Sequence, residues 1–261
     1  MKNTKEEWDQ VDPYNPKDDK WWVKIEHLAR YIFAGDYLAQ FKLQVIADIA
    51  TGVGYGIPEL RKASDSILAV DSSPEILAQA SAIYGGTDVT FARQDLEQDT
   101  MVSALGASSV DAIVSFETLE HLVNPSVAMA QFSQLIRPGG FLICSVPDAN
   151  AEPRWPIRMG GAGLPANKCH KQLFNFKSLS RLLNEHDFQI NYRVGQSWTN
   201  MFYRREDELI KNEIFQRKIG DRGELNTPEM IRDFAYLFAY PTAEDVDGSY
   251  SIMVVAQKAD R

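Results

Sequence analysis

A glycine-rich segment, residues 48–56, is the first place where residue type and spacing indicate chemistry. It reads Asp-Ile-Ala-Thr-Gly-Val-Gly-Tyr-Gly, and its glycines let the backbone turn sharply and approach a ligand without a Cβ atom in the way. A dinucleotide-binding GxGxxG loop would need a glycine at position 57, where Ile57 stands. Asp48, four positions before the first glycine, favours a ligand with a cationic group over a pyrophosphate.

Two aspartates follow the next two strand-like runs. Asp71 comes nineteen residues after Gly52, and a carboxylate there can accept two hydrogen bonds from a ribose diol. NAD and adenosyl ligands both carry that diol, so Asp71 does not separate them. Asp95 can accept a hydrogen bond from an adenine amino group, with Leu96 over a face of the ring. A simple turn or helix-capping role is the alternative for both aspartates.

Two carboxylates and an imidazole form a second constellation. Glu117, Glu120 and His121 are spaced i, i+3 and i+4, which brings them to one side of a helical turn. Oxygen-rich ligation suits Mg²⁺ or Mn²⁺, so the three predict a divalent-metal site. His170 is a candidate general base, because a histidine near its ordinary pKa of ~6.5 accepts a proton at neutral pH. A surface-loop histidine is the alternative.

The elements that must position these side chains alternate along the chain from about residue 43. Short apolar runs predict strands, and periodic or capped segments between them predict helices; this alternation is typical of a parallel sheet with right-handed crossovers. The expected strands are 45–50, 67–71, 89–93, 110–115, 141–146, 188–194 and 250–257. The expected helices begin after Pro58 and after Ser73, and further helices are expected at 124–136, 176–186, 202–218 and 227–240.

The bulk composition excludes several classes of protein. The chain has 261 residues and a formal net charge of −9, which disfavours long nucleic acids because their binding requires Lys and Arg to neutralise phosphates. No apolar run reaches the ~18 residues of a membrane span. The first twenty residues lack the apolar core of a signal peptide, so a cytoplasmic location is expected. Neither cysteine stands in a CxxC pair, which disfavours a disulfide framework or a cysteine zinc site.

Five successive segments together resemble class I S-adenosylmethionine-dependent methyltransferases, over about residues 44–147. They are DIATGVGYG, AVDSSPEIL, FARQDLE, VDAIVSFETLEHL and RPGGFLICSVP. The resemblance implies an α/β fold with a doubly wound, seven-stranded, mostly parallel sheet and an antiparallel last strand. Ala50 and Thr51 stand where the family often has Gly or Cys. The residues implied to bind S-adenosylmethionine are Asp48, Ala50, Gly52, Gly54, Asp71, Ser72, Asp95, Leu96, Ser115 and Phe116.

The ExxEH segment looks like the metal motif of small-RNA 2′-O-methyltransferases and of ubiquinone-pathway O-methyltransferases. That likeness implies Mg²⁺ or Mn²⁺ held by Glu117, Glu120, His121 and His170, with His170 and His121 as the catalytic candidates. Many metal-free methyltransferases carry a similar segment in which the Glu and His only order a loop. Both interpretations remain open from the sequence.

The remaining segments predict how the domain is arranged and what it methylates. Residues 1–42 are expected to form an N-terminal helical cap, and residues 43–261 a methyltransferase domain with helical lid insertions at about 148–172 and 198–247. ARYIFAGDYL and HKQLFNFKSLSRLL resemble bacterial O-methyltransferases of sugars and small metabolites. We therefore expect O-methylation of a small polar metabolite or a sugar or polysaccharide precursor.

Three alternative functions follow from the same residues. An RNA 2′-O-methyltransferase is favoured by ExxEH with His170 but disfavoured by the −9 charge. A homologue that binds the cofactor without catalysis has the same binding residues. An NAD-dependent oxidoreductase is disfavoured by Ile57. A small-molecule acceptor without a membrane partner is expected, while the acceptor's identity and the oligomeric state are not indicated.

Overall fold

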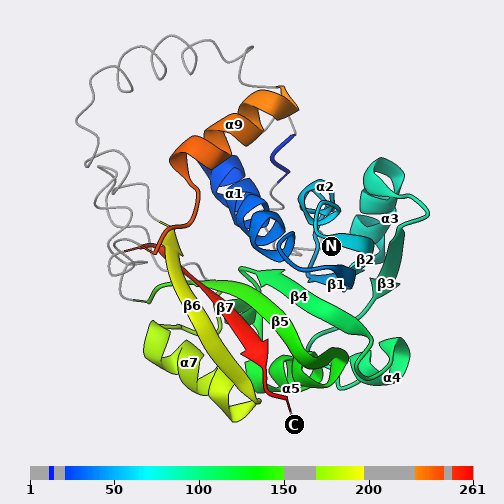
Figure 1. Cartoon of the computed structure of the whole chain (residues 1–261), viewed down its shortest axis with the longest axis vertical. Coiled ribbons are helices and arrows are strands. Elements are labelled where there is room, and N and C mark those ends of the chain that lie inside the picture. The colour runs from blue at the N-terminus through cyan, green and yellow to red at the C-terminus, as the bar shows by residue number, and fades with distance from the viewer. Residues whose placement is uncertain (1–11, 15–20, 150–168, 197–226, 244–248, 261) are drawn as a thin grey trace, which may run out of the picture.

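The computed structural model describes residues 12–14, 21–149, 169–196, 227–243 and 249–260, and its centre is one sheet of seven strands (Figure 1). The strands are β1 (Leu43–Ile49), β2 (Ser64–Asp71), β3 (Val89–Arg93), β4 (Val110–Phe116), β5 (Ile136–Pro147), β6 (Phe188–Gln196) and β7 (Ser251–Lys258). The helices are α1 (Trp21–Leu38), α2 (Ile57–Leu60), α3 (Pro74–Tyr84), α4 (Met101–Leu105), η1 (Leu119–His121), α5 (Pro125–Leu135), α7 (Phe176–Glu185) and α9 (Pro228–Phe238).

The order of strands across the sheet is β3-β2-β1-β4-β5-β7-β6. The first five strands pair in parallel, and β7 runs antiparallel to both of its neighbours. The predicted doubly wound sheet with an antiparallel last strand is therefore confirmed. The order reverses at β1, whose chain continues to β2 on one side while β4 pairs on the other; ligands of such sheets bind at this switch point, outside the carboxyl ends of the strands.

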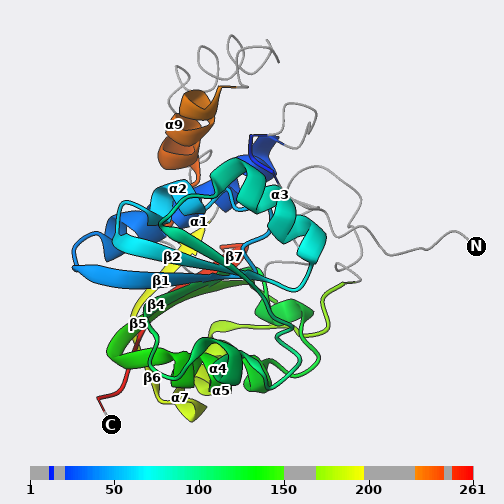
Figure 2. The same cartoon turned by 90° about the vertical axis from the view of Figure 1, so that its right-hand side faces the viewer.

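Successive side chains of each strand enter two separate cores. Ile46 belongs to the core that also contains residues of α1, α2, α3 and α9, whereas its neighbour Ala47 belongs to the core that contains residues of α4, α5 and α7. Figure 2 shows the resulting three layers, with the sheet between two groups of helices. The apolar run of β4 is buried on both faces, as expected for a central parallel strand.

Short polar residues set where the helices begin. The Ser73 side chain accepts a hydrogen bond from the Ile76 N–H, and Pro74 occupies the first position of α3, as the sequence predicts. β5 differs from the prediction: it begins at Ile136, so the Pro-Gly-Gly segment 138–140 lies inside an irregular strand instead of separating a helix from a strand. Gly139 permits this irregularity with a φ of +74°.

The predicted domain boundaries remain predictions. α1, from the expected N-terminal cap, packs directly on α2 and α9. The expected helix at 227–240 is confirmed as α9, whereas the expected helix at 202–218 and most of the first insertion lie outside the described residues. Among the described helices, none is long and apolar enough to cross a membrane.

Candidate active site

A cavity of about 350 Å³ lies at the carboxyl edge of the sheet. Asp95 follows β3, Asp71 ends β2 and the glycine loop follows β1, so these groups stand side by side along the edge. Glu117 follows β4, on the other side of the loop. The predicted site residues that line the cavity are Ala50, Gly52, Asp71, Ser72, Asp95, Leu96, Glu117 and His121.

Backbone amides hold the Asp71 carboxylate at the end of β2. The Gly52 N–H donates to Oδ2 at 3.1 Å, and the Ser73 N–H donates to Oδ1 at 3.0 Å. Gly52 itself has a φ of +56°, and no atom lies within 4 Å of where a Cβ would stand. The loop therefore turns tightly and leaves open space at Gly52, which is what a closely bound ligand requires.

Gly56 has a different role from the one that the loop pattern predicts. A Cβ at this position would lie 2.1 Å from the Cε1 atom of Tyr31, a buried residue of α1. Gly56 therefore admits an aromatic ring of the protein. Gly54 likewise does not line the cavity, because the space beside it is occupied by Tyr84 and Ala80 of α3.

Asp48 lies fully buried behind the glycine loop and does not line the cavity. Its two oxygens accept hydrogen bonds from the Tyr31 hydroxyl at 2.9 Å and the Thr51 hydroxyl at 2.6 Å. Burial raises the pKa of Asp48 to about 7, because the charged form loses its hydration, although both hydroxyl donors oppose this shift. The carboxyl group therefore changes charge near neutral pH.

The open side of the site differs from the expected arrangement. Ser115 is fully buried within β4, and Phe116 packs edge-on against Tyr31 with ring centroids 5.0 Å apart. Neither residue lines the cavity, whereas the next two residues, Glu117 and Thr118, do.

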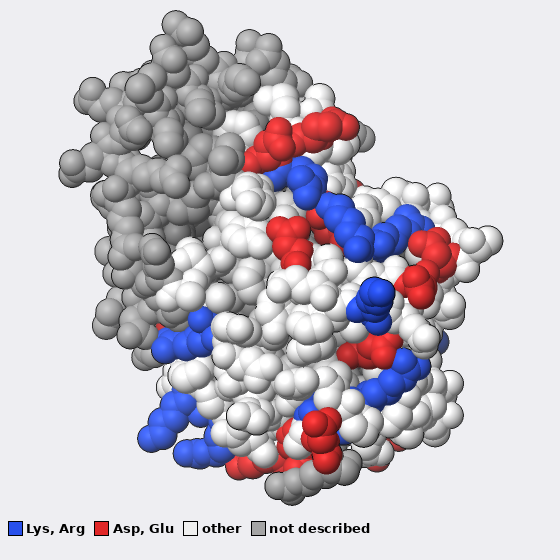
Figure 3. All heavy atoms as spheres, in the orientation of Figure 1, with Lys and Arg blue, Asp and Glu red and all other residues white. Residues whose placement is uncertain are grey.

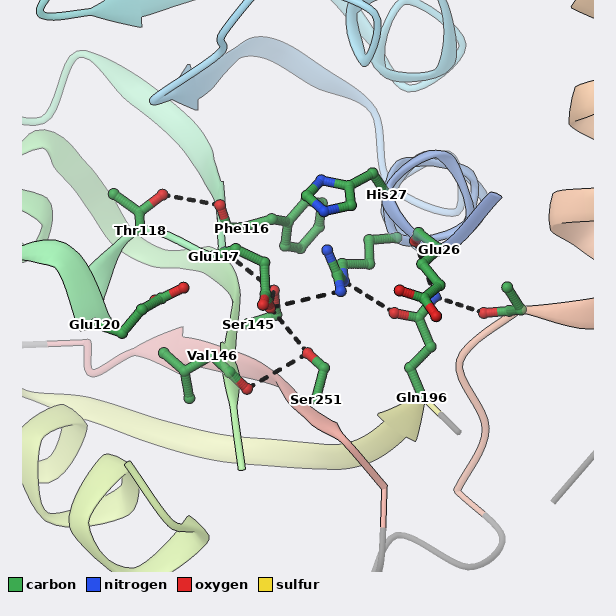
Figure 4. Close-up of polar contacts among 12 residues, drawn as sticks. Glu26, His27, Phe116, Glu117, Thr118, Glu120, Ser145, Val146, Gln196 and Ser251 are labelled. Carbon is green, nitrogen blue, oxygen red and sulfur yellow. Dashed lines mark hydrogen bonds and ion pairs between the residues drawn. The ribbon is translucent and has the colours of Figure 1, made fainter. Parts of the chain in front are cut away.

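Glu117 also departs from the predicted ExxEH geometry, which assumed one continuous helical turn. Its φ is +47°, and only Leu119–His121 form a short 3₁₀ turn, so Glu117 is not among the side chains that come within 4.8 Å of one another around Glu120 and His121. Its Oε1 atom accepts hydrogen bonds from the hydroxyls of Ser145 and Ser251 (Figure 4). The structure therefore corrects the predicted four-residue metal group by removing Glu117.

Glu120, His121 and His170 do come together. One possible ligand atom of each lies within 4.8 Å of the others, and the two imidazole rings are 5.0 Å apart. The Lys171 N–H donates to the Glu120 carbonyl at 2.8 Å, so the segment bearing His170 is attached directly to the 3₁₀ turn. Burial lowers the pKa of His121, which favours its neutral form.

Several site residues are absent from the sequence-based prediction. Lys171 lines the cavity, and Glu97 accepts a hydrogen bond from the Val123 N–H at 2.6 Å, which ties the segment after β3 to the segment after His121. Arg30 and Tyr31 reach the site from α1. The sequence did contain a signal for Arg30, because it is an arginine within an apolar helical stretch. A buried arginine needs an acidic or polar partner.

Comparison with known proteins identifies the family of this chain. The model of a methyltransferase domain family matches residues 26–192. The chain belongs to this family. It is thus an S-adenosylmethionine-dependent methyltransferase, with S-adenosylmethionine as its methyl donor.

The relatives of this methyltransferase are distant. It is 24% identical over 222 residues to a probable S-adenosylmethionine-dependent methyltransferase of Mycolicibacterium smegmatis, covering 81% of this chain and 80% of that protein. It is 25% identical to a ubiquinone biosynthesis O-methyltransferase of Nitrosococcus oceani over 51% of this chain, and it spans about half of that relative (53%).

A solved structure shares the fold. An S-adenosylmethionine-dependent methyltransferase from Mesorhizobium loti matches with a TM-score of 0.56 and 17% identity, over 90% of this chain and all of that chain (100%). At this identity the match supports the fold alone, since one fold serves many reactions.

Proposed function

We propose that this methyltransferase transfers a methyl group to an oxygen atom of a small polar molecule. The main support for this proposal is the cavity, which is lined by Asp95 and Asp71 as well as by Glu117 and His121. The first two carboxylates suit an adenosyl group, and the last two side chains bring proton-accepting groups to its other end. The ubiquinone biosynthesis relative, which is an O-methyltransferase by name, supports the choice of oxygen.

The proposed reaction is an in-line displacement at the sulfonium methyl. The methyl carbon–sulfur bond breaks, a carbon–oxygen bond forms, and the electron pair stays on sulfur. The hydroxyl proton of the acceptor passes to a base, for which His121 and His170 are the candidates. Because the sulfonium is already activated, the protein's main contribution is to position the acceptor and exclude water.

Calorimetry tests the donor, and a turnover assay tests the acceptor. We expect the protein to bind S-adenosylmethionine and to bind NAD more weakly or not at all. Incubation with panels of sugars, sugar nucleotides and hydroxylated aromatics should yield a product one methyl group heavier by mass spectrometry, with the methyl on oxygen by NMR. Tighter binding of NAD, or methylation only at nitrogen or carbon, would contradict the proposal.

An RNA acceptor is less well supported. On the face drawn in Figure 3, the basic side chains of the described residues are interspersed with acidic ones instead of forming a continuous patch. The net charge of −9 also disfavours RNA, because the phosphates of an RNA are repelled by an acidic protein. Methylation of a small RNA in the same assay, faster than of any small molecule, would reverse this preference.

As the alternative to a histidine base, we propose that Glu120, His121 and His170 hold a divalent cation; the two imidazoles are then ligands and do not accept the proton, which passes from the metal-polarised hydroxyl to solvent. Glu120 is only 1% exposed, and one of its carboxylate oxygens lies within 4.8 Å of a ring nitrogen of each histidine. One carboxylate and two imidazoles are a donor set that fits a divalent ion. Such an ion would supply positive charge near the acceptor hydroxyl. We expect elemental analysis to find stoichiometric metal that Glu120→Gln loses. Metal-free protein with full turnover in EDTA would exclude the cation.

A further inference from the structure

Glu117 occupies the end of the cavity that is opposite the predicted adenosine groups. The strand order β3-β2-β1-β4 places Asp95 and Asp71 on one side of the glycine loop and Glu117 on the other. An adenosyl ligand that uses both aspartates therefore directs its sulfur end toward β4. Glu117 has a φ of +47°, an uncommon backbone conformation for a residue with a side chain, which marks a position that its surroundings hold firmly.

Among the residues that the structure describes, hydrogen bonds reach only one of the two Glu117 oxygens. The Ser145 hydroxyl donates to Oε1 at 2.7 Å, the Ser251 hydroxyl donates to it at 2.9 Å, and Nη2 of Arg30 lies 3.7 Å away (Figure 4). No side chain or backbone group of the described residues donates a hydrogen bond to Oε2. The side chain lines the cavity and is 17% exposed, so Oε2 remains available to a ligand.

Arg30 explains why this carboxylate is held so firmly. Its guanidinium is 2% exposed, and its Nε donates to Gln196 Oε1 at 2.9 Å. The neighbouring Glu26 is also buried, and burial raises its pKa to about 8, which leaves it largely uncharged at neutral pH. Glu117 is therefore the carboxylate that balances the buried guanidinium charge.

We propose that Glu117 contacts the methyl acceptor, with Oε2 accepting a hydrogen bond from the hydroxyl or ammonium group of the acceptor next to the sulfonium methyl. This inference rests on the proposed function of methyl transfer. Oε1 is fixed by two serines and an arginine, so the free oxygen can orient the acceptor without reorganising. Acceptors that carry a hydrogen-bond donor at or beside the methylated atom are selected, and acceptors that carry a carboxylate there are disfavoured.

The test uses two adenosyl ligands and needs no knowledge of the acceptor. Sinefungin carries a protonated amine where the transferable methyl stands, whereas S-adenosylhomocysteine carries a neutral sulfur and nothing beyond it. Binding of both is measured by calorimetry to the wild type and to Glu117→Gln, which keeps the side chain's shape. We expect the variant to bind sinefungin at least tenfold more weakly and S-adenosylhomocysteine within twofold of the wild type.

Two further variants keep the result interpretable. Glu185→Gln removes the same charge from α7, away from the cavity lining, and should change neither affinity. Arg30→Met with Glu117→Gln removes both charges of the pair and leaves no buried guanidinium without a counter-charge, so we expect it to fold where the single variant does not and to show the same selective loss of sinefungin. Circular dichroism confirms that each protein is folded.

The outcomes separate the two proposals. Equal loss of both ligands, or no loss of either, would overturn the role of Glu117 while leaving methyl transfer intact. Failure of the wild type to bind any adenosyl ligand would overturn both.

Discussion

At the scale of single residues, the site depends on where charges are placed and what neutralises them. Asp71 is held by two backbone amides, while Asp48 is buried under two hydroxyl donors. The two carboxyls lie at the ends of adjacent strands, yet only Asp71 lines the cavity. They should therefore affect cofactor binding in different ways, Asp71 by direct contact and Asp48 by charge.

Replacing Asp71 by Asn should raise the dissociation constant of S-adenosylmethionine about tenfold. The amide keeps the size of the side chain but loses charge-assisted acceptance from a ribose diol, an interaction of about 1.5 kcal/mol. Asp65→Asn is the matched control, because Asp65 is an exposed carboxylate of the same strand and should not change the affinity. Equal binding by both variants in calorimetry would count against a ribose contact.

Cofactor affinity should rise with pH up to about 7. The Asp48 carboxyl faces Tyr31, Thr51 and Asp71, and its pKa of about 7 means that it is protonated below that pH. A cationic donor favours the ionised form, so binding below pH 7 releases a proton and tightens by up to about tenfold per pH unit. Calorimetry from pH 5.5 to 7 measures this slope, and Asp48→Asn should flatten it.

At the scale of elements, α1 joins the two ends of the site. Tyr31 donates a hydrogen bond to Asp48 near the end of β1, and the preceding residue, Arg30, reaches Glu117 after β4. The ring of Tyr31 also stands where a Cβ of residue 56 would be. The helix and the glycine loop therefore pack directly on one another, and mutations at their contact should have coupled effects on the free energy of unfolding.

Gly56→Ala should destabilise the protein by about 3 kcal/mol, the upper end of the usual cost of overpacking, because the added methyl overlaps the buried Tyr31 ring. Gly52→Ala is the control: its methyl meets no atom, and only the positive φ is strained, so about 1 kcal/mol should be lost. Urea unfolding measures both. Combining Gly56→Ala with Tyr31→Ala should cost less than the sum of the single changes; simple additivity would mean that the two sites do not touch.

The sequence predicts the elements well because their signals are local. The buried run of β4 and the Ser73–Pro74 start of α3 need only neighbouring residues to be recognised. The site is predicted less completely. Arg30 donates a hydrogen bond to Gln196, which lies 166 positions away in the sequence. No local sequence pattern reveals such a contact. The metal group was predicted with Glu117 because the i, i+3, i+4 rule assumes a helix, which the φ of +47° interrupts.

At the scale of the whole molecule, the buried ionisable groups predict how stability depends on pH. Burial raises the pKa of Glu26 from 4.5 to about 8, with Arg30, Tyr250 and Glu117 as the facing groups. Between these two values the folded state binds more protons than the unfolded state. Stability contributed by this group is therefore fully present below pH 4.5 and is lost as the pH rises to about 8.

Glu26→Gln should remove this dependence. The unfolding free energy of the wild type should fall relative to that of the variant by up to about 1.4 kcal/mol per pH unit between pH 5 and 8. Urea denaturation at several pH values measures the difference. Parallel curves for the two proteins would mean that Glu26 is already ionised in the folded state at pH 5.

The strand ends beside the site have a consequence for how this enzyme can change. The Tyr250 N–H donates to the Gln196 carbonyl at 3.1 Å, and Gly195 pairs with Thr242, so the chain leaves the sheet at β6 and returns to nearly the same point. A segment whose two ends already meet can be lengthened at little cost, since doubling a loop costs only about 0.6 kcal/mol in closure entropy. Substitution or extension of the chain between these anchors should therefore leave the pairing of β6 with β7 intact.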